Sequence, residues 1–327
     1  MKATVAQGWY TLKPTRKDMC SKAITLLLDF DKAFLTPKLS SQDAYYSPRL
    51  RTYNLGIFCG KDDHIHCFMY DESLGSTGPN EVISFLDYLL TELERKIGKY
   101  DHLIVWSDTA PGQFKECFLF FYLDHLVRRG QFLRIDFKFL LEGHTYSYCD
   151  RQFGVIQSLF QRQEVVDIPR KWAKVLEQGN LSNVEVHWLS LEMIKDFKSF
   201  LRLQYVSRTE ELDGEKIEVR SFVWLNFGYG EKVDENGQLH LVHHPESVFV
   251  RLAIDPKQLP KRVSFRKKKQ RIELRPELLK TLTMQRIEPV RDQVKRSCVK
   301  LARKYLSQHA IRLYESLSSI DEQEEHE

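Results

Sequence analysis

The sequence lacks a long apolar run. No stretch approaches the ~18 apolar residues that a bilayer crossing requires, and the longest candidates, 24–28 and 118–123, are short and flanked by charged residues. The beginning of the chain carries scattered Lys and Asp instead of a basic start followed by an apolar block, which argues against a secretory signal. We therefore expect a protein without membrane association.

Paired cysteine motifs are also missing. The six cysteines include no C-x-x-C pair, and three of them lie in apolar stretches, which is typical of reduced, buried thiols in an intracellular protein. The stretch from His64 to Cys67 resembles a metal cluster, but strand alternation places His64 and His66 on one face and Cys67 on the other. Because no partner pair at useful spacing follows, we expect no zinc site there.

Positive charge is concentrated in one segment. The net charge of the chain is only +4, yet residues 257–312 contain 18 Lys or Arg and 4 Asp or Glu, while six acids and no Lys or Arg follow from Leu313 onward. The remainder is therefore net negative. Clustered cations of this kind indicate a phosphate-binding surface, and the same residues also suit a nuclear-localisation signal or a solvated linker.

Apolar periodicity predicts an α/β domain over residues 23–163. We expect strands at 23–30, 50–59, 64–70, 102–107 and 133–141, and helices beginning at Pro79, Phe114 and Tyr148. The resulting order, βββ-α-β-α-β-α, predicts a mixed five-stranded sheet with helices on its faces, and it is the topology of the RNase H-like fold.

The sequence outside residues 23–163 divides into an N-terminal segment and three C-terminal ones. Residues 1–22 form an N-terminal extension. We expect a small α+β appendage at 164–256, with helices near 172–176 and 192–203 and strands at 218–227 and 247–254. A basic linker follows at 257–275, and a helical region with an acidic tail at 276–327, the second of its two helices carrying an apolar face from Val290 to Tyr305.

Three aspartates fall at the ends of predicted elements. Asp29 ends the first strand, Asp108 ends the fourth, and Asp150 begins a helix after the fifth. If the first and fourth strands are parallel neighbours, the carboxyl groups meet at one edge of the sheet. Clustered carboxylates repel one another unless cations lie between them, and hard oxygen ligands suit two Mg²⁺ or Mn²⁺ ions.

Each aspartate taken alone has a simpler explanation. Asp150 could cap its helix, and Asp108 could begin the turn that follows it. Asp31 shares a strand face with Asp29 and could replace it as the first ligand, although its position makes Asp29 the preferred one. Glu142 is a possible fourth acid.

Short motifs around these aspartates resemble a family. They comprise Asp29-Phe30 with Thr36-Pro37-Lys38-Leu39, Tyr53-Asn54-Leu55-Gly56-Ile57, Ser107-Asp108 with Gly112-Gln113 and Lys115, and Gly143-His144 with Cys149-Asp150-Arg151, Phe153-Gly154 and Ile156. In this order, over residues 22–165, the sequence resembles a eukaryotic transposon-derived family with an RNase H-like DDE/DDD transposase domain. The resemblance implies Asp29, Asp108 and Asp150 as the acidic triad. The sequence departs from the family at Asp31, Phe114 and Glu116, which leaves room for a domesticated protein.

The resemblance implies a transposase-like nuclease that cleaves DNA with two Mg²⁺ or Mn²⁺ ions and transfers the strand. The basic segment adds the expectation of a nuclear location, and a homo-oligomer is an open alternative to a monomer. The alternatives are a catalytically silent, transposase-derived nucleic-acid-binding protein and a nuclease acting on RNA–DNA hybrids. The candidate nucleic-acid contacts are Gln113, Lys115, His144, Arg151, Lys267, Lys268, Lys269 and Arg271.

Overall fold

A single mixed sheet organises the protein. The computed structural model describes residues 23–110, 112–140, 148–206, 217–233, 239–252, 260–267 and 288–320. The sheet has ten strands in the order β10-β9-β8-β6-β5-β1-β3-β4-β7, with β2 paired to β3. Its strands are β1 Ala23–Phe30, β2 Phe34–Thr36, β3 Leu50–Cys59, β4 His64–Asp71, β5 His102–Ser107, β6 Arg134–Phe139, β7 Val184–Trp188, β8 Trp224–Val233, β9 Leu239–Arg251 and β10 Lys261–Val263.

Helices cover both faces of this sheet, and a separate pair of strands lies outside it. The described helices are α3 Gln42–Tyr46, α4 Pro79–Ile97, α5 Cys117–Arg128, α6 Tyr148–Gln161, α7 Arg170–Gln178, α8 Phe197–Arg202, α10 Asp292–Tyr305 and α11 Gln308–Ser316, with 3₁₀ turns at Leu191–Met193 and Val219–Ser221. The short strands β11 Val290–Arg291 and β12 Ser319–Ile320 pair with each other. Among the described helices, none combines the length and apolarity that a bilayer crossing requires.

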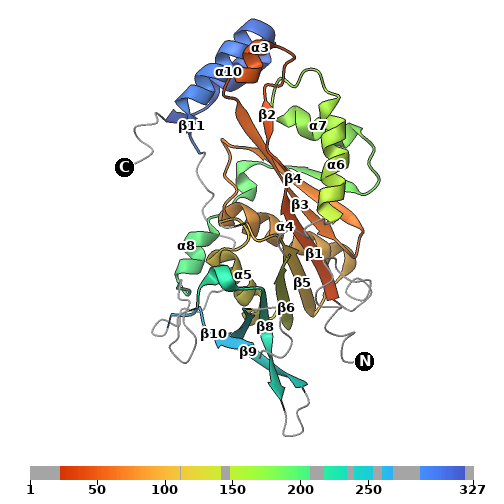
Figure 1. Ribbon diagram of the computed structural model, residues 1–327, viewed down its shortest axis with the longest axis vertical. Helices are drawn as coiled ribbons and strands as arrows, with labels where there is room; N and C mark the ends of the chain where they lie inside the picture. The colour runs from red at the N-terminus through yellow and green to blue at the C-terminus, as the bar shows by residue number, and fades with distance from the viewer. Residues whose placement is uncertain are drawn as a thin grey trace.

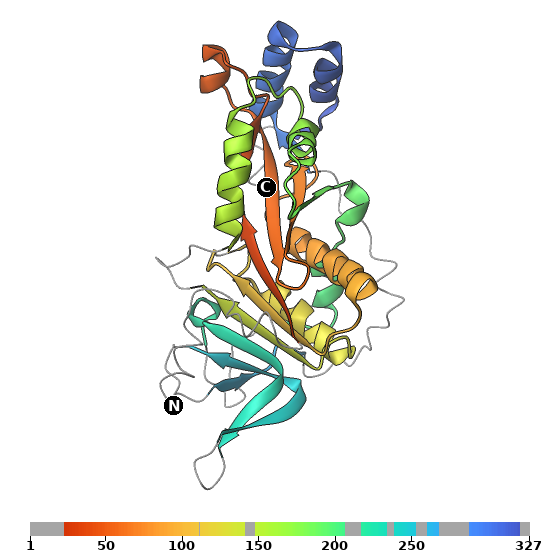
Figure 2. The same cartoon turned by 90° about the vertical axis from the view of Figure 1, so that its right-hand side faces the viewer.

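The strand β1 lies at the centre because it is apolar on both faces. Leu26 and Leu28 pack into the core beneath α4, α5 and α8, whereas Leu27 packs into a second core beneath α6 and α7. Figure 2 shows α6 and α4 on opposite sides of these strands. The strand β1 pairs antiparallel with β3 and parallel with β5, and β5 pairs parallel with β6. The predicted mixed α/β sheet with helices on its faces is therefore present.

The sheet is larger than the predicted five strands. Strands from the region expected to form an appendage extend it at both ends: β7 pairs parallel with β4, and β8 pairs antiparallel with β6. The long β8–β9 hairpin forms the lower end of the molecule in Figure 1. The predicted basic linker also contributes the edge strand β10, which pairs with β9.

Several predicted bounds differ from the structure. The helix expected over 192–203 is two pieces, a 3₁₀ turn at Leu191–Met193 and then α8, because the Asp196 carboxylate accepts from the Ser199 N–H and starts a new helix. The strand expected at 218–227 begins instead with the 3₁₀ turn at Val219–Ser221.

The C-terminal helices form a third, smaller core. Cys298, Ala302, Ala310 and Tyr314 of α10 and α11 pack against Leu50 at the start of β3. Both helices lie together at the upper end of the molecule in Figures 1 and 2. The apolar face expected to continue to Tyr305 ends earlier, since Tyr305 is exposed. Residues 276–287, where the first C-terminal helix was expected, lie outside the described residues.

Candidate active site

The first two aspartates lie at the ends of neighbouring parallel strands. Asp29 is near the end of β1, and Asp108 directly follows β5. The register pairs Leu28 with Ser107, so the next residue on each strand is one of these aspartates. Figure 1 shows β1 and β5 side by side. Because both strands run in the same direction, their carboxyl ends place the two side chains at one edge of the sheet.

The third aspartate comes from α6, which packs directly on these strands. Asp150 lies in the first turn of α6. The preceding Cys149 donates from Sγ to the Leu27 carbonyl oxygen of β1 at 3.5 Å. One turn further on, the Phe153 ring lies so close to Gly56 of β3 that a Cβ there would come within 2.7 Å of it. The absent side chain of Gly56 therefore allows α6 to approach the strand that neighbours Asp29.

The negative charges of these aspartates act on one another: Asp108 and Asp150 act on Asp29, and Asp150 acts on Asp108. Burial, together with the negative charges of Asp108 and Asp150, raises the pKa of Asp29 to about 8. Burial also raises the pKa of Asp108, with a contribution from the charge of Asp150. Like charges held together in a desolvated place destabilise one another. The fold therefore maintains an unfavourable arrangement of acids, which is a common property of functional sites.

Asp31 is a fourth carboxylate of the same group. Burial raises its pKa to about 6, and the charge of Asp150 contributes in the same direction. Its Oδ1 accepts from Gln157 Nε2 of α6 at 2.6 Å and from the Lys32 N–H at 2.7 Å. Its Oδ2 is buried and accepts no hydrogen bond from the described residues. The choice between Asp29 and Asp31 as the first ligand therefore stays open.

These residues fit a divalent cation. The donor set consists of carboxylate oxygens, which Mg²⁺ and Mn²⁺ prefer. The buried Oδ2 of Asp31 has no hydrogen-bond partner among the residues that the structure describes. The mutual repulsion of the other three acids would be relieved by a positive charge between them. The other proposed acid, Glu142, lies outside the described residues.

Two proposed phosphate contacts are not at a helix start. The helix α5 begins at Cys117, with Glu116 as its N-cap and its carboxylate accepting from the Phe118 N–H at 2.6 Å. Gln113 and Lys115 precede it, so the expectation that they begin the helix was wrong. Gln113 Nε2 donates to Thr77 Oγ1 at 3.4 Å, and Lys115 Nζ lies 4.8 Å from the centre of the Phe139 ring.

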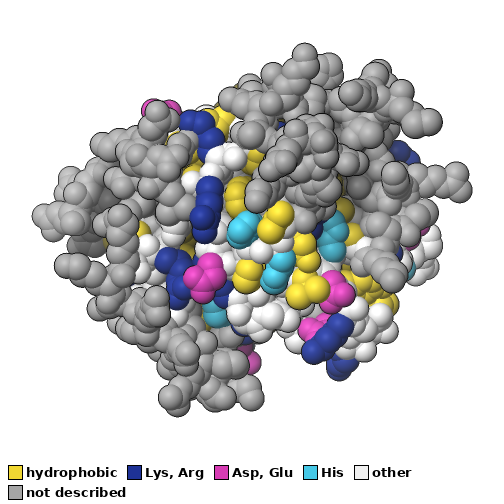
Figure 3. Space-filling view, turned by 90° about the horizontal axis from the view of Figure 1, so that it is seen from below, with side chains coloured by type: hydrophobic (Ala, Val, Ile, Leu, Met, Phe, Trp, Pro, Cys, Tyr) yellow, Lys and Arg dark blue, Asp and Glu magenta, His cyan; other side chains and the backbone are white. Residues whose placement is uncertain are grey.

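The other proposed nucleic-acid contacts are described only in part. Arg151 is exposed beside Asp150, with its guanidinium 5.5 Å from the centre of the Tyr148 ring. Lys267 donates its backbone N–H to the Gln204 carbonyl. Four further candidates lie outside the described residues: His144, Lys268, Lys269 and Arg271. On the face seen from below, the described basic side chains are mixed with acidic, histidine and apolar ones (Figure 3).

The sequence argument missed one cluster. We expected no zinc site near His66 because no partner pair follows at a useful spacing, and this reasoning considered neighbours along the chain alone. The structure brings Glu185 and His187 of β7 next to His66 of β4. The available signal was the alternation in Val184–Trp188, which puts Glu185 and His187 on one face of a strand. The pairing of that strand with β4 could not be read from either segment alone.

Comparison with known proteins gives a family of undefined activity. Residues 43–215 match a family model described as "Domain of unknown function (DUF7869)". No curated protein matches the chain. Among solved structures, the chain has a likeness to the QDE-2 AGO MID-PIWI domains of N. crassa, with 10% identity and a TM-score of 0.23. That match covers 49% of this chain and 50% of the other, so the likeness spans about half of each.

Proposed function

This chain belongs to the family of a domain of unknown function, DUF7869, and we propose that it is an RNase H-like nuclease of the DDE/DDD transposase type. Its reaction would be Mg²⁺-dependent or Mn²⁺-dependent hydrolysis of a DNA strand, followed by attack of the freed 3′-hydroxyl on a second phosphodiester. The proposal includes DNA as partner and the nucleus as location, in line with the basic segment over 257–312.

The strand order supports this proposal. From β4 to β6 the order is β4-β3-β1-β5-β6, with antiparallel pairs on one side of β1 and parallel pairs on the other. The helix α6, which follows the last of these strands, returns to pack on β1 and β3. This arrangement supports the proposal, although β2 and α3 lie between the first two of the expected strands.

The carrying observation is that Asp29 and Asp108 follow paired residues of two parallel strands, while Asp150 lies in the first turn of the helix that packs on β1. The charges of Asp108 and Asp150 both raise the pKa of Asp29, which agrees with this placement. Two Mg²⁺ or Mn²⁺ ions bound there would activate the attacking oxygen and stabilise the leaving oxygen. The protein's own contribution is positioning. The Cys149 and Phe153 contacts hold α6 on the sheet. In this proposal the exposed Arg151 would contact a phosphate beside Asp150.

The test is a cleavage assay on the full-length protein with duplex DNA, single-stranded DNA and an RNA–DNA hybrid. Asp29→Asn, Asp108→Asn and Asp150→Asn should each reduce metal-dependent cleavage by orders of magnitude. Asp63→Asn is the matched control, because Asp63 is an exposed turn residue whose positive φ suits asparagine equally well.

The same assay separates the alternatives. If Asp31→Asn is more damaging than Asp29→Asn, Asp31 is the first ligand. Preference for the hybrid would favour the RNase H-type activity over transposition. Wild-type protein that binds DNA and cleaves none of these substrates with either metal would overturn the enzymatic proposal and leave the silent DNA-binding protein.

A further inference from the structure

A second cluster of metal-ligand side chains lies on the other face of the sheet. His66 of β4 is the direct register partner of Glu185 in β7, and His187 is two residues further along β7. All three side chains therefore project from the same face of two paired strands. His187 stacks on Phe68, which belongs to the core beneath α4. Asp29 alternates with Leu28 and shares the α6 face with Leu27, so the two clusters are independent.

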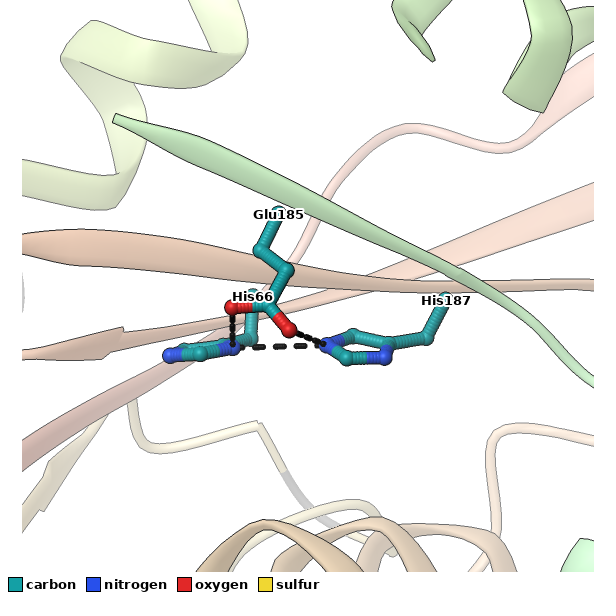
Figure 4. A group of neighbouring side chains, drawn as sticks. All are labelled: His66, Glu185 and His187. Atoms are coloured by element: carbon teal, nitrogen blue, oxygen red, sulfur yellow. Dashed lines mark hydrogen bonds and ion pairs between the residues drawn. The ribbon is translucent and has the colours of Figure 1, made fainter. Parts of the chain in front are cut away.

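One ligand atom from each of the three side chains lies within 4.8 Å of the other two, and each imidazole faces a different oxygen of Glu185. His66 Nδ1 lies 3.3 Å from His187 Nε2 and 3.5 Å from Glu185 Oε2, and His187 Nε2 lies 3.7 Å from Glu185 Oε1. Figure 4 shows these atoms directed toward one another. Zinc–nitrogen bonds of about 2.0–2.1 Å at a tetrahedral angle separate two ligand atoms by about 3.3–3.4 Å. A single ion therefore fits between the three groups with small side-chain adjustments.

The surroundings orient both imidazoles. Asp62 Oδ2 lies 3.0 Å from His66 Nε2 and accepts a hydrogen bond from it. In a neutral imidazole with its proton on Nε2, the lone pair of Nδ1 is directed at the cluster, an arrangement common among metal-binding histidines. The His187 ring stacks on Phe68, with ring centres 4.6 Å apart, and meets the Tyr88 ring edge to face, with centres 5.7 Å apart.

One ion pair competes with a metal ion for Glu185, and it is weak. Lys96 of α4 forms an ion pair with Glu185, with Nζ–oxygen distances of 3.3 and 3.4 Å. Both side chains are more than a third exposed, so solvent screens the pair and its contribution is small. Lys96 can move into solvent and release the carboxylate to another cation.

We propose that His66, Glu185 and His187 bind one divalent transition-metal ion of the zinc class, with Asp62 orienting His66. Imidazole nitrogens select zinc, cobalt or nickel over magnesium, so the ion differs in kind from the one expected among the aspartates. Three protein ligands leave a fourth position for water. The ion connects the edge strand β7 to β4 and thereby stabilises the outer edge of the sheet.

The test uses full-length protein freed of metal by a chelator and titrated with Zn²⁺ and, separately, with Co²⁺. We expect one Zn²⁺ bound per chain, a higher melting temperature with Zn²⁺, and the visible absorption of tetrahedral Co²⁺. His187→Gln and Glu185→Gln should abolish stoichiometric binding. Asp62→Asn should weaken it by about 10–100-fold, as loss of a residue that orients a ligand does.

Two controls make the result specific. His64→Gln changes a histidine on the same strand that hydrogen-bonds to the Asp62 carbonyl outside the cluster, and it should leave Zn²⁺ affinity unchanged. Lys96→Met removes the competing cation and should raise the affinity by about two- to fivefold, the worth of a surface ion pair. A purely structural ion-pair cluster predicts no such gain.

Three results would contradict the proposed metal site. Wild-type protein that binds no Zn²⁺ at micromolar concentration, or His187→Gln protein that binds it as the wild type does, would overturn the metal site. Zn²⁺ binding that is lost in Asp108→Asn but retained in His187→Gln would place the ion among the aspartates and would also overturn it. None of these outcomes bears on cleavage activity.

Discussion

The thiol of Cys149 donates a hydrogen bond to the carbonyl oxygen of Leu27 across an Sγ–O distance of 3.5 Å. Burial raises the pKa of this thiol well above its usual value, so it remains a protonated donor at neutral pH. The contact joins the residue before Asp150 to the residue two positions before Asp29. It therefore fixes where the first turn of α6 lies along β1, and with it the relation between two of the acids.

The close approach of α6 to β3 predicts opposite effects for two glycine substitutions. Gly56→Ala should destabilise the protein by about 1–3 kcal/mol, because a Cβ would overlap the buried Phe153 ring. Gly154→Ala, on α6 itself, meets no atom within 4 Å and should stabilise it by about 0.5–1 kcal/mol through helix propensity. Urea unfolding of both variants checks this, and equal effects would contradict the packing described.

The mutual repulsion of the acids predicts a gain of stability when one is neutralised. Without metal, Asp108→Asn should melt about 2–4 °C higher than the wild type for each kcal/mol of repulsion removed. Mg²⁺ or Mn²⁺ should raise the melting temperature of the wild type but hardly that of the variant. Thermal unfolding with and without metal measures both effects. Asp63→Asn should behave as the wild type, and an unchanged or lower melting temperature for Asp108→Asn would argue against repulsion.

The buried Asp136 predicts acid-dependent stability. Burial alone would raise the pKa of this carboxyl group, but the hydrogen bond from His102 and the charge of Arg134 hold it well below its usual value. Trp224 Nε1 and Asn226 Nδ2 also donate to it, at 3.0 and 2.6 Å. Asp136→Asn should lower the free energy of unfolding at pH 7 by about 3 kcal/mol, because the cations lose their partner.

The sign of the pH effect follows from the lowered pKa. The ionised group stabilises the fold fully above the unfolded-state pKa of about 3.9, and this contribution disappears as pH falls from there toward the folded-state pKa. The wild type should therefore lose stability below about pH 4, and Asp136→Asn should lose less over the same interval. Denaturant unfolding at several acidic pH values measures this. Identical pH profiles for the two proteins would refute it.

The basic segment predicts a change in salt dependence. If Lys267, Lys268, Lys269 and Arg271 contact phosphates, changing all four to Ala should reduce the slope of log affinity against log salt by up to about four. Binding should weaken similarly on unrelated sequences, because phosphate contacts carry no sequence information. Titrations at several salt concentrations provide the measurement. An unchanged slope accompanied by loss of nuclear entry would show that the segment is only an import signal.

The central strands could be predicted from the sequence because burial on both faces leaves a short, uninterrupted apolar run. The bounds expected for β1 and β5 are those observed, and each run ends at an acid that cannot enter the core. The helix α5 was expected three residues too early, because Phe114 is buried without being helical. An apolar residue marks burial, whereas the start of this helix depends on the Glu116 cap.

Strand β7 shows why part of the site could not be predicted. Its residues are half-buried, and apolar residues alternate with polar ones, a pattern typical of an edge strand. The pattern does not identify the strand with which it pairs. His66 and His187 are 121 residues apart, and neither segment contains a signal that specifies the other. Asp31 could be named as an alternative ligand from the sequence, but its hydrogen bond from Gln157 of α6 could not, because the two residues are 126 positions apart.

The parallel pairing of β4 with β7 has a consequence for synthesis on the ribosome. The segment between Asp71 and Val184 must emerge before β4 acquires its outer neighbour. Until then β4 presents unpaired backbone groups to solvent, and such an open edge can recruit other nascent chains. Pairing between strands so far apart in the sequence also slows folding. Chains truncated before β7 should therefore aggregate, even though they contain the whole of the central five strands.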